Sequence, residues 1–262
     1  METFRHSHSL GQNFLTDKNL LAAIVSDAGV SADDVVIEVG AGMGALTRPL
    51  AASGARVISY EVDDRLREYL EPLKREYANL ELRFGDFMKE DISTATGGAR
   101  YKAVANLPYY ITTPVLFRFL EDPLCDGITV MVQKEVAERI TAKAGGKDYG
   151  ALSVAAQISG TPRITRNVGR NLFTPPPNVD SAVVNIRLSP DRPDESVRRV
   201  IRAAFSMRRK TLVNCLTGAG YAKDKVLSAL SALSLDPAVR GERLTPMQFT
   251  ELAAHLYIAF HF

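Results

Sequence analysis

Apolar and polar positions in the first part of the chain follow two rhythms, one typical of strands and one of helices. DVVIEVG (34–40), ARVISYEVD (55–63) and YKAVANLP (101–108) are short apolar runs that predict buried strands. LELRFGDF (80–87) predicts another strand, and between these runs stretches such as ALTRPLAASG (45–54) have the apolar spacing of helices. Strands separated by helices at this rhythm predict a mostly parallel α/β sheet with helices on both faces.

The pattern changes after Gly145. FTPPPNVDSAVVNIRL (173–188) reads as a proline-led loop followed by one alternating strand, and beyond it we find only helical spacing. We therefore predict two domains, a large α/β domain over residues 1–188 and a small helical domain over residues 189–262.

Charge and composition add limited information. The net charge is only +2, but residues 189–262 contain 11 Lys and Arg against 7 Asp and Glu, so the basic excess lies in the second predicted domain. Cys125 and Cys215 form neither a metal-ligand pattern nor a disulfide framework, and the first ten residues lack the apolar core of a signal peptide. We expect a cytoplasmic protein with no membrane span and no bound metal, and nothing in the sequence indicates an obligate oligomer.

A glycine-rich loop follows the first predicted strand. Gly40, Gly42 and Ala45 fit the dinucleotide-binding fingerprint G-x-G-x-x-G/A, and Glu61 follows 21 positions after Gly40, where an acid can bind ribose hydroxyls. A nicotinamide-binding site therefore remains open at this point. So does a tight turn without any ligand.

S-adenosylmethionine enzymes use the same architecture for a different purpose. Their glycines let the backbone approach the methionine and ribose parts, and an acid before the loop, here Glu38, can serve the loop or the cofactor ammonium. Asp86 ends the third predicted strand, where a carboxylate could accept a hydrogen bond from the cofactor adenine. Because ligands bind at the carboxyl ends of such strands, acids at three successive strand ends predict an adenosine-containing cofactor.

The end of the fourth predicted strand, Asn106-Leu107-Pro108-Tyr109, distinguishes between the cofactors. The Asn106 amide oxygen and the Pro108 carbonyl could accept the two N–H groups of an adenine amine, which is a poor nucleophile in the planar form. Since proline has no N–H, we expect its carbonyl to be free of local pairing. Tyr109 offers a flat face for a base. Hydride transfer has no obvious need for these groups, so the pattern favours methyl transfer to adenine.

Seven motifs in order resemble the bacterial small-subunit (16S) ribosomal RNA adenine N6-dimethyltransferase family. They are SLGQNFL, EVGAGMGALT, YEVD, GDF, NLPYYITTP, FTPPPNVDSAVV and AAFSMRRKTL. The resemblance implies the class I S-adenosylmethionine-dependent methyltransferase fold (Rossmann-like) with a small helical domain that contacts RNA. It further implies S-adenosylmethionine as cofactor and, as substrate, two adjacent adenines in the 3′-terminal hairpin loop of 16S RNA within the assembling 30S subunit.

The resemblance also implies roles for individual residues. Asn106, Pro108 and Tyr109 would hold the target adenine, with Phe173 stacked on its other side. The residues expected to contact the cofactor are Asn13, Leu15, Gly40, Gly42, Glu61, Asp86 and Asn106.

Basic residues on either side of residue 188 are candidates for phosphate contacts, which would fix the register of the RNA while the base pocket selects adenine. They are Arg163, Arg166, Arg170, Arg198, Arg199, Arg202, Arg208, Arg209 and Lys210. A solvent-facing charged helix would give the later part of this pattern equally well.

Several alternatives remain. Large-subunit RNA adenine methyltransferases generally lack the PPPNVDS segment, and DNA-adenine and protein-glutamine methyltransferases favour a second proline where this chain has Leu107. A nicotinamide dehydrogenase would be a different chemistry, and a non-catalytic checkpoint of subunit assembly would be a different role.

Overall fold

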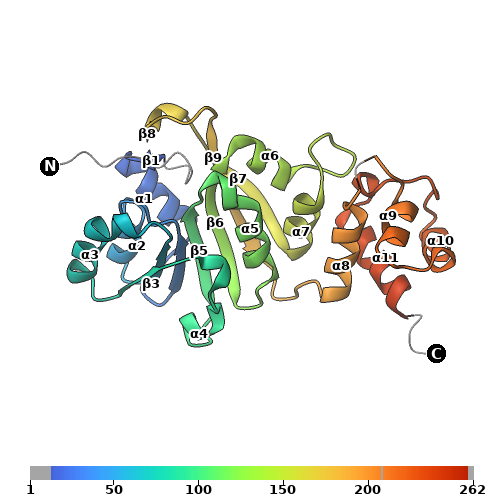
Figure 1. Cartoon of the computed structure of the whole chain (residues 1–262), viewed down its shortest axis with the longest axis horizontal. Helices are drawn as coiled ribbons and strands as arrows, with labels where there is room; N and C mark the ends of the chain where they lie inside the picture. The colour runs from blue at the N-terminus through green and yellow to red at the C-terminus, as the bar shows by residue number, and fades with distance from the viewer. Residues whose placement is uncertain (1–12, 208, 259–262) are drawn as a thin grey trace. The chain divides into compact units, whose positions relative to one another are not determined.

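The computed structural model describes residues 13–207 and 209–258 (Figure 1). The chain divides into two compact units. The first consists of the residues up to Ala137 together with Arg163–Leu188, and the second of Glu138–Pro162 together with the residues from Ser189 onward. The sequence-based division at residue 188 placed the segment 138–162 in the first domain. Its apolar side chains, including Tyr149 and Val154, belong to the hydrophobic core of the second unit.

A seven-stranded sheet in the order β4-β3-β2-β5-β6-β9-β7 organises the first unit. Its strands are β2 Val35–Val39, β3 Arg56–Glu61, β4 Leu80–Phe84, β5 Tyr101–Asn106, β6 Cys125–Gln133, β7 Gly160–Val168 and β9 Ser181–Leu188. The pairs from β4 to β6 are parallel, and β9 pairs antiparallel to β6. The sheet is thus mixed, with a parallel core.

Helices cover both faces of this sheet because successive strand residues point to opposite sides. Val36 and Val57 pack with α1, α2 and α3, whereas Tyr60 on the other face meets Phe87, which in turn contacts Phe119 of α5. The helices of this unit are α1 Lys18–Asp27, α2 Thr47–Ala52, α3 Arg67–Glu76, α4 Ile92–Thr96 and α5 Thr112–Glu121, and α6 Lys134–Thr141 follows β6. This arrangement confirms the predicted α/β class.

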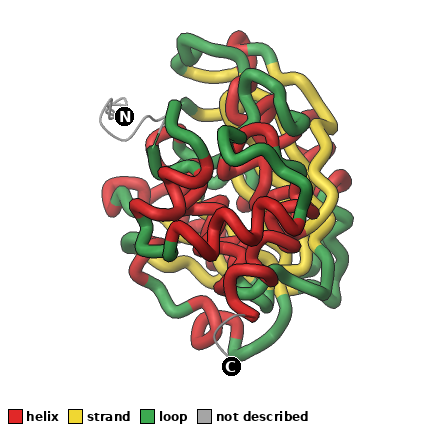
Figure 2. Tube along the Cα trace, turned by 90° about the vertical axis from the view of Figure 1, so that its right-hand side faces the viewer, coloured by secondary structure: helices red, strands yellow, loops and turns green. Residues whose placement is uncertain are grey.

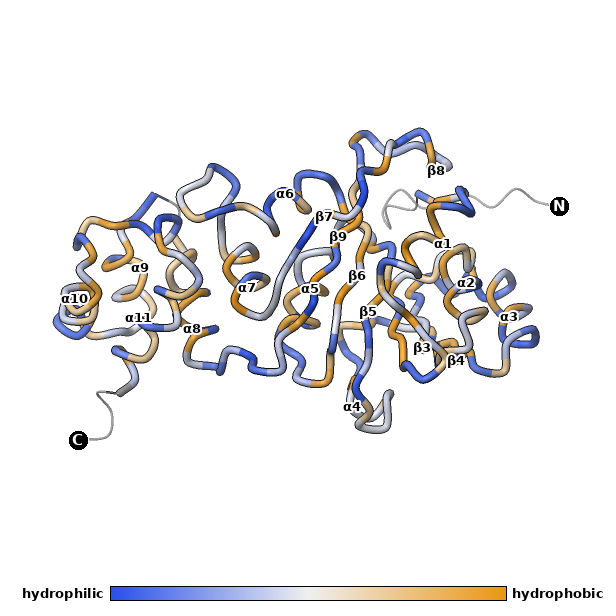
Figure 3. Tube along the Cα trace, turned by 180° about the vertical axis from the view of Figure 1, so that it is seen from behind, coloured by the Kyte–Doolittle hydropathy of each residue, from blue (hydrophilic) through white to orange (hydrophobic). Residues whose placement is uncertain are grey.

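Strand β7 was not predicted, and its composition explains why. Its sequence GTPRITRNV is polar, and it lies at the end of the strand order, where one side of a strand has no neighbour. Figure 3 shows β7 largely in white and blue, with more orange along β6. A separate two-stranded antiparallel pair joins β1 (Phe14–Leu15) to β8 (Phe173–Thr174), which brings the start of the described chain beside the proline-led loop.

The second unit consists of helices, drawn in red near the C-terminus label in Figure 2. They are α7 Ala151–Ser159, α8 Glu195–Ala204, α9 Leu212–Gly218, α10 Lys223–Ala232 and α11 Pro246–Ile258. Asp194 begins α8 by accepting a hydrogen bond from the Val197 N–H at 3.0 Å, a standard N-cap. Phe249 of α11 is fully buried and packs against Phe205 with ring centroids 5.8 Å apart. Among the residues described, no helix combines the length and the apolar character that crossing a membrane requires.

The packing of the glycine loop against α3 generates a test of the fold. Gly44 has φ +80°, and a Cβ there would lie 2.3 Å from Leu73 Cδ1. Gly97 has φ +69° with nothing within 4 Å of a Cβ, so Gly97→Ala is the matched control for backbone strain alone. We expect Gly97→Ala to lower the free energy of unfolding by about 1 kcal/mol. Gly44→Ala should lower it by about 2 kcal/mol or more, because overpacking adds to the strain.

Denaturant unfolding of both variants provides the measurement. Equal losses of stability in the two variants would contradict a close contact between Gly44 and Leu73.

Candidate active site

The glycine loop begins at the end of β2 and makes a sharp turn there. Gly40 and Gly42 have φ values of +82° and +58°, which other residues rarely adopt. The Gly40 and Ala41 N–H groups both donate to the Tyr60 carbonyl, at 2.9 and 3.1 Å. A Cβ on Gly40 would lie 3.0 Å from Pro108 Cδ, so this glycine allows the loop to contact the end of β5.

Glu61 ends β3 beside this loop and is only 7% exposed. One carboxylate oxygen accepts the Gly42 N–H at 2.8 Å and the other accepts the Asp63 N–H at 2.9 Å. Burial raises the pKa of Glu61, and the backbone hydrogen bonds oppose that rise. Because an ionised carboxylate has about four acceptor positions, Glu61 keeps acceptor capacity beyond these backbone donors, which a ribose hydroxyl could use.

Glu38 has a different role from Glu61. It is 1% exposed, it does not line the cleft, and one of its oxygens accepts hydrogen bonds from Thr47 at 2.7 Å and Ser59 at 2.6 Å. Burial raises its pKa to about 7, against the effect of these two hydroxyls. These two hydrogen bonds tie β2 to β3 and to α2, the helix that follows the loop.

Asn106 is the last residue of β5, and the next residue fixes its position. The Leu107 N–H donates to the Met131 carbonyl at 3.1 Å, and the Leu107 side chain is 1% exposed. Asn106 lines the cleft, and no residue in the described ranges hydrogen-bonds its side-chain amide. Its amide therefore has open donor and acceptor positions.

Tyr109 lines the cleft on the other side of Pro108, and its hydroxyl lies 2.8 Å from Ser181 Oγ. Burial raises the pKa of Tyr109, so the phenol stays neutral and the ring is held by one hydrogen bond.

The Pro108 carbonyl differs from the expectation. It accepts the Ile111 N–H at 3.2 Å and the Thr112 hydroxyl at 3.0 Å, so the idea that it lacks local pairing is wrong. The missing N–H of proline removes a donor and has no influence on what its carbonyl accepts, because the turn Tyr109–Ile111 folds back onto it. The Thr112 bond comes from a rotatable hydroxyl, which can release one lone pair of this oxygen.

A strap formed by β1 and β8 provides another wall of the cleft. Leu15 pairs with Phe173, and a Cβ on Gly42 would lie 3.0 Å from the Phe14 ring. Phe173 lines the cleft but is only 4% exposed and belongs to the hydrophobic core. Its predicted stacking role stays a prediction.

Most of the predicted site residues meet in this cleft. It includes Asn13, Leu15, Gly40, Gly42, Glu61, Asn106, Pro108, Tyr109 and Phe173. The cleft also includes residues to which the sequence analysis gave no role, among them Phe14, Met43, Val62, Leu66 and Tyr110. Phe14, Val62 and Tyr110 each adjoin a predicted site residue, which was the available signal.

The cleft is narrow, with a cavity volume of about 70 Å³. Ligand pockets typically measure about 300–1,000 Å³, so an adenosine-sized cofactor requires the walls to move apart. Val62 and Tyr110 are 48% and 51% exposed and are the least packed of these walls.

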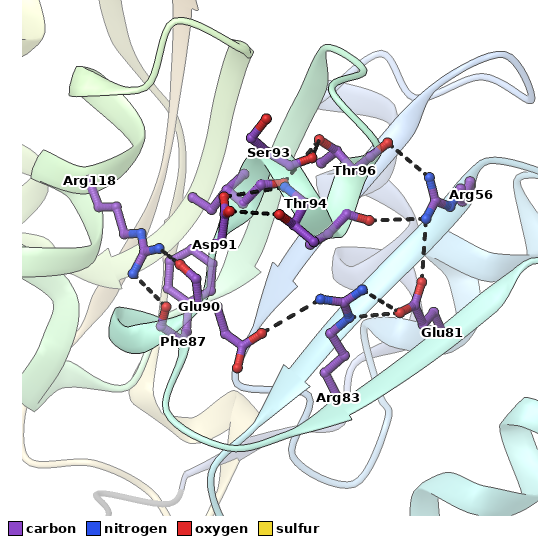
Figure 4. Close-up of polar contacts among 12 residues, drawn as sticks. Arg56, Glu81, Arg83, Phe87, Glu90, Asp91, Ser93, Thr94, Thr96 and Arg118 are labelled. Carbon is purple, nitrogen blue, oxygen red and sulfur yellow. Dashed lines mark hydrogen bonds and ion pairs between the residues drawn. The ribbon is translucent and has the colours of Figure 1, made fainter.

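Asp86 is absent from the described walls of the cleft. Its carboxylate accepts the Met88 N–H at 3.0 Å and so begins the turn Phe87–Lys89. Arginines anchor the segment that follows (Figure 4): Arg118 donates to the carbonyls of Phe87 and Glu90. Arg56 donates to the carbonyl of Thr96 at 3.1 Å. The predicted contact of Asp86 with the cofactor stays a prediction.

The predicted phosphate-binding residues lie on both units. Arg166 on β7 forms a two-pronged pair with Asp27 at 2.8 Å, and Arg170 donates to the Asn178 carbonyl at 3.3 Å. Arg198 and Arg202 on α8 both pair with Glu195. Arg163, Arg199, Arg209 and Lys210 are exposed. Arg208 and the part of the SLGQNFL motif before Asn13 lie outside the described residues.

The sheet, its flanking helices and the glycine loop beside Glu61 define a class I S-adenosylmethionine-dependent methyltransferase fold. Residues 3–254 match the family model described as ribosomal RNA adenine dimethylase. The chain belongs to this family, as the motifs predicted.

Individual relatives agree with the family model. The chain is 43% identical to ribosomal RNA small subunit methyltransferase A of Lysinibacillus sphaericus, with 98% of this chain and 93% of the relative covered. It is 40% identical to the protein of that name in Clostridioides difficile, over 95% of this chain and 90% of the relative.

Two crystal structures share both fold and sequence with this chain. A dimethyladenosine transferase from Plasmodium falciparum superposes with a TM-score of 0.76 at 27% identity, covering 91% of this chain and 95% of that one. The 23S rRNA methyltransferase ErmE superposes with a TM-score of 0.68, also at 27% identity, covering 93% and 99%. The small-subunit relatives are therefore more similar in sequence than this large-subunit enzyme, and the nicotinamide alternative is not supported.

The buried carboxyl of Glu38 predicts a specific pH dependence of stability. Its pKa is about 7 in the folded state, against an ordinary value of 4.5, so the folded chain binds more protons between these values. The stability linked to Glu38 is therefore fully present below about pH 4.5 and is lost as the pH rises through 7, by on the order of 3 kcal/mol. We expect Glu38→Gln to remove most of this decline.

Urea unfolding at a series of pH values between 5 and 8 measures the effect. Glu76→Gln is the control, because Glu76 is an exposed carboxylate whose pKa is lowered by Arg48. An unchanged decline in Glu38→Gln would show that this carboxyl ionises normally.

Proposed function

We propose that this protein methylates adenine N6 in small-subunit ribosomal RNA, with S-adenosylmethionine as the methyl donor. The family membership and the identity to small-subunit relatives support this function. The observation that carries it is the position of Asn106, whose unpaired amide lies in the same cleft as the glycine loop and Glu61.

The residues of the cleft fit the donor. Gly40 and Gly42 let the backbone approach a ligand where a side chain would meet Pro108 or Phe14, and Glu61 keeps acceptor capacity for ribose hydroxyls. When bound, the cofactor supplies an electrophilic methyl group on a sulfonium sulfur. The apolar walls Leu66 and Leu107 exclude water from this part of the cleft.

Asn106 would orient the acceptor amine. Its amide oxygen accepts one N–H of the adenine N6 group, which turns the nitrogen lone pair toward the methyl carbon. The Pro108 carbonyl accepts the second N–H after the Thr112 hydroxyl has turned away. Positioning of this kind is effective because the reacting atoms must lie about 3–3.5 Å apart and in line.

Tyr109 and Phe173 would hold the ring of the target base. The hydrogen bond to Ser181 fixes the Tyr109 ring, and base–aromatic stacking is worth about 1–3 kcal/mol per base. Phe173 is buried, so it contributes after the walls separate. The base has to leave its stack to enter, which costs least in a hairpin loop.

The finer assignment extends the family resemblance. The targets are two adjacent adenines in the 3′-terminal hairpin loop of 16S RNA, methylated twice each during 30S assembly by a cytoplasmic monomer. The basic residues of β7 and of the second unit would contact phosphates, and the second unit would be the RNA-contacting domain, with residues 138–162 added to it.

Asn106→Ala tests this function directly. We expect the rate of methyl transfer to unmethylated 30S particles to fall about 100-fold or more, as for the loss of one positioned polar group at a reacting centre. Binding of particles and of S-adenosylhomocysteine should stay within about two-fold, because Asn106 is one contact among many. Asn106→Asp keeps an acceptor oxygen and should recover part of the rate.

Transfer of a labelled methyl group gives the rate, and sedimentation with 30S particles gives binding. Equal losses of rate and particle binding in Asn106→Ala would contradict a role of this amide in orienting the base. Full activity in Asn106→Ala would overturn the proposed function of the cleft.

A further inference from the structure

The second unit has a large cavity of its own, with a volume of about 670 Å³. This lies within the range of about 300–1,000 Å³ that ligand pockets occupy. Its walls come from α8, from the connection between α9 and α10, and from the last turn of α11. We call it the α8–α11 pocket.

Cationic side chains line this pocket. Arg199 and Arg202 come from α8 and Lys225 from the first turn of α10, and no carboxylate is among its walls within the described residues. Arg202 pairs with Glu195 at 3.2 Å, whereas Arg199 lies close enough to Tyr221 for its charge to lower the pKa of that phenol, against the larger effect of burial. The pocket therefore favours an anionic ligand.

Two tyrosines give the pocket a second property. The Tyr221 and Tyr257 hydroxyls lie 3.0 Å apart, and their rings meet edge to face with centroids 6.2 Å apart. Both rings are half-buried and pack against the hydrophobic core of the second unit, and both also line the pocket. Small residues occupy the rest of the rim, among them Ala219 and Gly220, and a Cβ on Gly220 would meet nothing within 4 Å. A flat group has room beside the tyrosines.

We propose that the α8–α11 pocket binds a single-stranded nucleotide of the ribosomal RNA, with its base against Tyr221 and its phosphates on Arg199, Arg202 and Lys225. Cations together with aromatic side chains in the wall of a groove are the combination by which single-stranded RNA is held without sequence preference. This inference rests on the proposed RNA substrate. The pocket has no amide at a strand end and no glycine loop, so it is a docking site and performs no methyl transfer.

A labelled uridine octamer is a suitable probe for the full-length protein, because it contains no adenine and is not a substrate for methylation. Its affinity is measured by fluorescence anisotropy over a range of salt concentrations. We expect Arg199→Glu to weaken binding about ten-fold or more and to reduce the salt slope by about 0.7, the value for one phosphate contact on a single strand. Lys223→Glu makes the same kind of change on α10 outside the pocket and should have an effect below about two-fold.

Substitutions of Tyr221 separate stacking from charge. Tyr221→Leu should weaken binding about five-fold or more without altering the salt slope, because stacking releases no counterions. Tyr221→Phe keeps the ring and loses only the hydrogen bond to Tyr257, so it should bind within about two-fold of the original protein.

Two results would overturn the proposal. Equal weakening by Arg199→Glu and Lys223→Glu would mean that only the general charge of the unit matters. Displacement of the probe by inorganic triphosphate, together with no effect of Tyr221→Leu, would mean an anion site that takes no base. Methyl transfer by Asn106→Ala is a separate measurement, so a failure of the pocket and a failure of the proposed function are distinguishable.

Discussion

The site depends on one close approach, between the glycine loop and the end of the neighbouring strand. Strands β2 and β5 are parallel neighbours with Val36 opposite Lys102, and this register continued along both strands places Gly40 opposite Asn106. The Asn106 carbonyl and the Pro108 ring lie 3.5 and 3.0 Å from where a Gly40 Cβ would be. Only glycine allows this contact at φ +82°, so one residue sets the spacing between the glycine loop and the segment that begins at Asn106.

Three acids at neighbouring strand ends show how environment separates similar side chains. Glu38 is buried among hydroxyls and has a raised pKa, which makes it a neutral tie between elements at moderate acidity. Burial raises the pKa of Glu61 as well, but backbone N–H groups that include those of Gly42 and Asp63 oppose this rise at the cleft wall. Asp86 caps the turn that follows β4. All three side chains are carboxylates, so the sequence alone did not distinguish them. The number and kind of hydrogen-bond donors around each carboxylate decide its role.

The sequence predicted the parallel core, both helical faces and about half of the residues that line the cleft, because these follow from short-range periodicity and from residues next to strand ends. It did not predict β7, whose polar residues suit an end position in the sheet, nor the grouping of residues 138–162 with the second unit, which depends on contacts distant in the sequence. The pairing of the Pro108 carbonyl also escaped prediction. It depends on how the turn after Pro108 folds back, and a tetrapeptide motif does not contain that information.

The two cavities differ in the kind of binding that they suit, selective in the cleft and non-selective in the α8–α11 pocket. The cleft at Asn106 has a volume of about 70 Å³. In the proposed function it would have to open to take a base, and only a base that pairs with its polar groups would offset that cost. The α8–α11 pocket, at about 670 Å³, is already wide, and charge and stacking there are indifferent to base identity. Under the proposed functions, non-selective binding in the α8–α11 pocket would leave base selection to the cleft, because an RNA held by its phosphates would still have to place an adenine beside the Asn106 amide.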